Sequence, residues 1–133
     1  MNIGRRTCGA VNFQIYVGLR DVMTGVNHSI SSVYNICQKY VDSIGWSVTV
    51  TPTNFLYKNG REEGAIIGII NYPRFPLTTN DIKERVEILA VNLLRDLQQL
   101  RLTIVDNSVS LMLENEDLIK VCTAVFGRAD SDV

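Results

Sequence analysis

The hydrophobic pattern of this chain changes period several times, and the order of those changes restricts the possible folds more than any other feature. Apolar residues alternate with polar ones over 11–19, recur at three- and four-residue steps over 29–44, and alternate or cluster again over 47–57 and 64–72. A second helical repeat over 78–100 and a strand that begins near 102 complete the order strand, helix, strand, strand, helix, strand. That order is the split βαβ pattern of ferredoxin-like domains.

The expected fold is therefore an α+β, ferredoxin-like βαββαβ sandwich, in which two helices cover one face of an antiparallel sheet. Right-handed crossovers place the first and third strands in the centre of that sheet. The third strand supports this placement, because Ile66 and Ile70 lie on one of its faces and Ile67 and Ile69 on the other. Residues 109–125 are expected to add a strand and a short helix at the C-terminal end.

Capping and turn residues mark the ends of several elements. The Ser29 hydroxyl can accept a free amide of the first helical turn, and Thr78 can do the same for the second helix. Pro52 removes a hydrogen-bond donor from the second strand, which therefore belongs at an edge of the sheet. Asn59 and Gly60 readily take positive φ and predict a hairpin between the second and third strands.

Length and charge exclude several classes of protein. The 133 residues suit one domain, 1–133, with flexible ends at 1–9 and 128–133. Lys and Arg number 13 against 14 for Asp and Glu, so no large basic field is present to hold a phosphate backbone. Arg5 and Arg6 form the single basic cluster, in a polar N-terminal stretch that is more typical of a loose end than of a nucleic-acid arm. Nucleic acid is not an expected partner.

The cysteines indicate a reducing compartment. Cys8, Cys37 and Cys122 are widely spaced, with no Cys-x-x-Cys pair and no nearby histidines, so neither disulfides nor a metal site is expected. Cys37 and Cys122 fall on apolar faces of predicted helices, which leaves Cys8 as the plausible reactive thiol. No apolar run is long enough for a membrane span or has the form of a secretion signal, so a cytoplasmic location is expected.

No familiar catalytic motif is present. The chain lacks a phosphate-binding loop, a Gly-x-Ser-x-Gly turn and a His-Glu-x-x-His helix, and no cofactor is expected. His28 is its one histidine and shares a connecting loop with Asp21, so the two are candidates for a hydrogen-bonded acid/base pair. The alternative is a solvated loop histidine, which is favoured because no nucleophile is nearby.

The sheet face opposite the helices is the expected binding surface. Aromatic and aliphatic residues gather there without a predicted cover, and exposed apolar area of that extent is typical of an interface. Arg74, in the rigid Tyr-Pro-Arg-Phe-Pro segment 72–76, could hold an anion, although Phe75 could instead fill the core beneath the second helix while Arg74 is solvated. Residues 57–63 are interpreted as a solvated hairpin tip. The candidate ligand-binding residues are Asn12, Gln14, Tyr16, Arg20, Tyr72 and Arg74.

Two hypotheses for function follow. The first is a homodimeric module that binds a small molecule or a protein through the sheet face, unless the C-terminal strand and helix fold over that face. The second is a small cofactor-free enzyme with a pocket on the sheet face or at the dimer interface, in which His28 or Asp21 acts as general base and Arg20 or Arg74 holds an anionic substrate.

Segments 15–21, 48–57 and 69–76 resemble those of small orphan proteins carried by phages and integron gene cassettes. The resemblance extends over about residues 11–114. It implies a setting on mobile genetic elements and carries no catalytic signature, so it implies no site.

Overall fold

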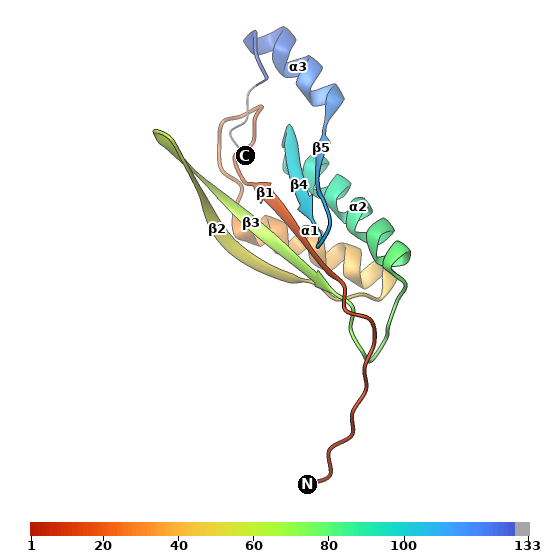
Figure 1. Ribbon diagram of the computed structural model, residues 1–133. Helices are drawn as coiled ribbons and strands as arrows, with labels where there is room; N and C mark the ends of the chain where they lie inside the picture. The colour runs from red at the N-terminus through yellow and green to blue at the C-terminus, as the bar shows by residue number, and fades with distance from the viewer. Residues whose placement is uncertain (130–133) are drawn as a thin grey trace.

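The computed structural model describes residues 1–129 and has the predicted ferredoxin-like architecture (Figure 1). Five antiparallel strands form one sheet in the order β2-β3-β1-β4-β5, with α1 and α2 against one face. The central positions of β1 and β3 and the edge position of β2 are confirmed. The elements are β1 (Asn12–Gly18), α1 (Ile30–Ile44), β2 (Thr49–Tyr57), β3 (Gly60–Ile70), α2 (Thr79–Asp96), β4 (Arg101–Val105), β5 (Ser110–Glu114) and α3 (Glu116–Phe126).

The core lies between the sheet and the two long helices. Alternate residues of the central strands point into it, as the two-residue period predicts. It is closed from the helix side by the apolar stripe of α2 and by one face of α1. The fully buried side chains include Ile15, Val17, Val33, Ile67, Ile69, Ile82, Val86, Leu89 and Leu93.

Two of the predicted helix ends differ from the structure. Thr78 caps α2 as expected, with its hydroxyl accepting from the Asp81 amide at 3.1 Å, whereas the Ser29 side chain makes no capping hydrogen bond to α1. Helix α2 ends at Asp96 rather than near residue 100, because Gln98 takes a positive φ of 48°. Leu100 is still buried, but in the turn that leads to β4.

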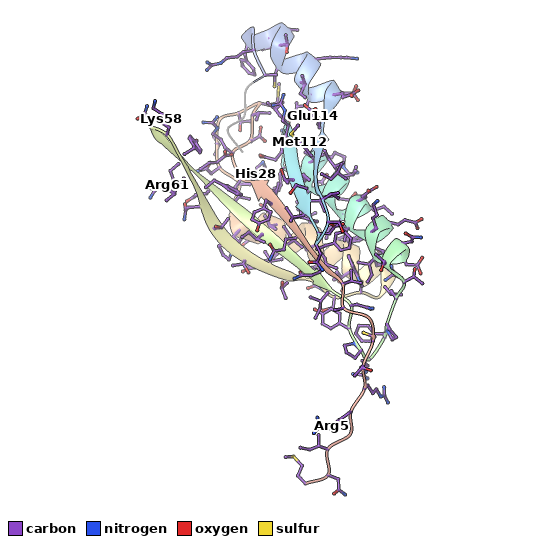
Figure 2. The ribbon with its side chains drawn as sticks, viewed as in Figure 1. Arg5, His28, Lys58, Arg61, Met112 and Glu114 are labelled. Atoms are coloured by element: carbon purple, nitrogen blue, oxygen red, sulfur yellow. The ribbon has the colours of Figure 1, made fainter. Side chains whose placement is uncertain are left out.

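The β2–β3 hairpin is longer than the sequence pattern indicates. Tyr57 pairs with Gly60, so the turn residues are Lys58 and Asn59, and Asn59 has the positive φ, 62°. Strand β3 therefore starts at Gly60 and not at Gly64. Figure 2 shows Lys58 and Arg61 at the outer end of this hairpin, away from the helices.

The C-terminal elements do not cover the open face of the sheet. Strand β5 pairs with β4 and widens the sheet, while α3 lies beyond the ends of the strands (Figure 1). Of the expected flexible end, residues 130–133 are outside the described range. None of the helices described is long and apolar enough to cross a membrane.

Candidate functional site

The open face of the sheet gathers the polar and aromatic residues of the central strands. Gln14 of β1 pairs with Gly68 of β3, and Tyr16 pairs with Ile66, so these side chains share the face that points away from the helices. The Tyr16 hydroxyl donates to the Gln14 side-chain oxygen at 2.7 Å. Asn12, Gln14 and Tyr16 thus share one face, as expected; their role in binding stays a prediction.

Glycines on this face make room for larger side chains that lie across the strands. The Phe55 ring occupies the space where Gly64 would carry a Cβ, and the Tyr57 ring does the same over Gly60. Phe55 also meets Tyr16, with 6.5 Å between the ring centroids and an interplanar angle of 56°. Tyr16, Phe55 and Tyr57 are hereafter called the aromatic floor.

A carboxylate lies beside the aromatic floor. Glu62 pairs directly with Phe55 across β2 and β3, is half-buried, and places one carboxylate oxygen 2.5 Å from the position that a Cβ on Gly18 would occupy. The interpretation of Glu62 as part of a solvated hairpin tip is therefore wrong. The usable signal was the period of β3, since Glu62, Gly64 and Ile66 must share one face once the strand begins at Gly60.

An arginine-rich hollow of about 1150 Å³ adjoins the same end of β1. Arg20, Arg101 and Arg128 line it, between the loop after β1 and helix α3. Arg101 is on the face of β4 that carries Thr103, the pairing partner of Tyr16, and its guanidinium forms an ion pair with Glu114 at 2.9 Å. The hollow can accept an anionic group at the edge of the aromatic floor.

Asp21 and His28 form the hydrogen-bonded pair that the sequence indicated as a candidate beside the favoured solvated histidine, with 3.1 Å between His28 Nε2 and Asp21 Oδ2. Asp21 is only 4% exposed and also accepts from the Met23 and Thr24 amides and from the Gln98 side chain. Burial raises the pKa of Asp21, but the amide and His28 hydrogen bonds more than offset this and leave the pKa below its ordinary value. A carboxylate bound this fully is suited to holding a loop, and a catalytic role for the pair stays a prediction.

The remaining candidates lie apart from the aromatic floor. Tyr72 and Arg74 follow the C-terminal end of β3, whereas Arg20 follows the C-terminal end of β1. Because these two strands pair antiparallel, their C-terminal ends lie at opposite ends of the sheet along the strand direction. Tyr72 instead packs on Phe75, with 5.8 Å between the ring centroids. Phe75 is 48% exposed and does not fill the core, so that interpretation is wrong. The same alternative also placed Arg74 in solvent, and Arg74 is indeed exposed.

No group of three or more His, Cys, Asp or Glu side chains within residues 1–129 is arranged to hold a metal ion. Neither of the two hypotheses for function requires one.

The fold and the site together define a small α+β, ferredoxin-like domain with an open sheet face that combines aromatic rings, a carboxylate and adjacent arginines. No protein-family model matches the chain, and a search of curated proteins gives no match.

Among solved structures, the chain is similar to a phage SAM lyase in complex with S-methyl-5'-thioadenosine, with a TM-score of 0.68 and 18% sequence identity over 87% of this chain and 98% of that chain. The phage SAM lyase in its apo state gives a TM-score of 0.67, 18% identity and coverage of 86% and 98%. A de novo designed protein with a ferredoxin fold gives a TM-score of 0.40 and 13% identity over 80% and 84%.

Proposed function

We propose that this chain binds S-adenosylmethionine on the open face of its sheet and cleaves it to S-methyl-5'-thioadenosine. The observation that carries the proposal is the half-buried Glu62 carboxylate beside the aromatic floor. The structural similarity to a phage SAM lyase, over 87% of this chain, supplies the choice of ligand. The proposal favours the enzyme over the binding module among the two hypotheses from sequence.

The chemistry of the face suits the two ends of this ligand. A sulfonium is a soft cation that is attracted to aromatic faces and to carboxylates, which Phe55 and Glu62 provide. The flat adenine ring can stack on Tyr16 or Tyr57, since every base presents a π face. The methionine carboxylate can reach the arginine-rich hollow, where Arg20 offers a planar pair of donors.

The cleavage needs neither a metal nor a redox cofactor. The bond between the sulfonium sulfur and Cγ of the methionine part breaks, and sulfur keeps both electrons and leaves as a neutral thioether. In the same step, either a base removes a proton from Cβ and a Cβ–Cγ double bond forms, or the fragment's own carboxylate oxygen attacks Cγ and closes a lactone. In the first case Glu62 accepts the proton. In the second case the negative charge of Glu62 holds the sulfonium in place and keeps Cγ aligned with the attacking oxygen.

The test is calorimetric titration with both molecules, with chromatography to follow the thioadenosine product. We expect Glu62→Gln to weaken binding of S-adenosylmethionine by about 10- to 100-fold, as loss of a charge-assisted contact does, and to leave binding of the neutral thioether nearly unchanged. Phe55→Leu should weaken binding of both. The matched control is Glu63→Gln, because Glu63 neighbours Glu62 but points to the opposite face of β3.

The outcomes separate the two hypotheses. Binding with product formation supports the lyase. Binding without product supports a module that binds the nucleoside and returns the protein to the first hypothesis. Absence of binding by either molecule, or equal effects of Glu62→Gln on both, would overturn the proposed site.

A further inference from the structure

A long apolar groove lies on the side of the molecule away from the aromatic floor. Two hollows, of about 410 and 720 Å³, meet at Val91 of α2. Ile88, which lines the first hollow, is 53% exposed because it lies outside the buried stripe of α2. The apolar residues that line the hollows are Ile88, Val91, Leu94, Leu113, Leu118 and Val121. We call this surface the α2–β5–α3 groove.

The rim of the groove is acidic. Glu84 and Glu87 line the first hollow, and Glu116 and Asp117 line the second. Within residues 1–129, none of these four carboxylates forms an ion pair. Arg95, the basic residue in the lining, is paired with Asp96 at 2.8 Å. The groove therefore suits a segment that is apolar and positively charged.

The N-terminal segment of the same chain has this character. Residues 1–7 are exposed and carry two apolar side chains, Met1 and Ile3, followed by Arg5 and Arg6. Neither arginine forms an ion pair within the described part of the chain. We call residues 1–7 the arm.

The arm leaves the body in a direction that is fixed at its base. The Asn71 side chain donates to the Gly9 carbonyl at 2.9 Å, and the Cys8 thiol donates to the Asn71 carbonyl at 3.6 Å. Beyond these anchors the arm extends away from every strand and helix (Figure 1), and Figure 2 shows Arg5 far from the rest of the molecule. Seven extended residues reach roughly 23 Å, so the arm can extend well beyond the body of its own chain.

We propose that the arm of one copy docks in the α2–β5–α3 groove of a second copy, so that Ile3 fills the groove and Arg5 and Arg6 pair with the acidic rim. The second copy is favoured over the arm's own groove because the anchors at Gly9 and Cys8 aim the arm outward. When two copies exchange their arms reciprocally, the contact is two-fold symmetric and closes as a dimer. It is independent of the proposed function and leaves the open sheet face accessible.

The test is a charge swap followed by light scattering. The arm-reversed chain carries Arg5→Glu and Arg6→Glu, and the groove-reversed chain carries Glu84→Lys and Glu87→Lys. Each chain alone brings like charges together, so we expect each to dissociate at concentrations roughly 100-fold or more above those for the unmodified protein. An equimolar mixture of the two pairs opposite charges at both contacts, and we expect it to recover the oligomer.

The control is the double change Lys58→Glu and Arg61→Glu at the hairpin tip, which alters the net charge by the same amount as the arm reversal but lies away from the groove. Circular dichroism on each variant checks that it is folded. Oligomers of the unmodified and control chains, monomers of each reversed chain and recovery in the mixture support the proposal. A monomeric unmodified protein, oligomers that survive either reversal, or a mixture that stays monomeric would overturn it.

Discussion

The carboxylate of Glu62 rests over Gly18, with one oxygen 2.5 Å from where a Cβ of residue 18 would stand. The two residues belong to different strands, β3 and β1, and meet because the strands pair antiparallel. A glycine at position 18 therefore leaves room for the Glu62 carboxylate beside the aromatic floor.

Gly18→Ala should lower the affinity for S-adenosylmethionine much more than it lowers the stability of the fold. The new methyl group would displace the end of the Glu62 side chain, which is long enough to move, and would stand 3.1 Å from the side-chain oxygen of Gln99, which has to shift only slightly. We expect a change in the free energy of unfolding below about 1 kcal/mol and a clear loss of affinity for S-adenosylmethionine. Urea denaturation and calorimetric titration measure the two quantities. An unchanged affinity would argue against a role for the Glu62 position in binding.

Gly64→Ala should destabilise the fold. Here the added Cβ would meet the Phe55 ring and would stand 2.7 Å from the backbone carbonyl oxygen of Val17, which cannot move alone. We expect a loss of about 1–3 kcal/mol in the free energy of unfolding, measured in urea. Gly4→Ala is the control, because nothing lies within 4 Å of its added Cβ. Equal midpoints for the two variants would contradict the overpacking argument.

Asn71→Ala should loosen both segments that the side chain connects. The Asn71 side chain donates to the Gly9 and Leu77 carbonyls and accepts from the Leu77 amide. Removing it leaves partly buried polar groups without partners, so we expect a loss of about 1–3 kcal/mol in urea denaturation. The arm should also become more sensitive to protease. Asn54→Ala, at an exposed position of β2, should change neither property.

Asp21 should contribute to stability above acidic pH. Its pKa in the folded protein lies below the ordinary value of 3.8, so its stabilisation is present above that value and is lost as the pH falls through the lower folded-state pKa. In urea denaturation from about pH 6 to about pH 2, we expect Asp21→Asn to be less stable near neutrality and to show a flatter acid dependence. Asp42→Asn, at an exposed carboxylate of α1, should follow the unmodified protein.

Thiol accessibility should distinguish Cys8 from the other two cysteines. Burial raises the pKa of Cys37 to about 11, and Cys37 and Cys122 are 3% and 2% exposed, whereas Cys8 is partly exposed. Because the thiolate is the reactive form, a colorimetric thiol reagent at neutral pH should label one site in the folded protein and three after denaturation. Cys8→Ser should remove the folded-state signal, and a retained signal would show that a buried thiol is accessible.

Much of the fold followed from the sequence because it depends on patterns that repeat over a few residues. The period-two run in β1, the helical stripe of α2 and the Thr78 cap each act between neighbours in the chain, and each is confirmed. Chain order and crossover handedness then left one arrangement of the central strands. The Asp21–His28 hydrogen bond could be named only as a candidate, since both residues share one loop but the sequence favoured a solvated histidine.

The composition of the site was decided by the tertiary structure. Glu62 reaches the aromatic floor only because β3 starts at Gly60 and pairs with both β1 and β2, and strand register depends on contacts between residues far apart in sequence. The same register sends Tyr72 and Arg74 to the opposite end from Arg20. The chain's local periodicity determined which residues form each element, whereas long-range pairing determined which of those residues meet, because side chains on one sheet face come from strands that no local pattern aligns.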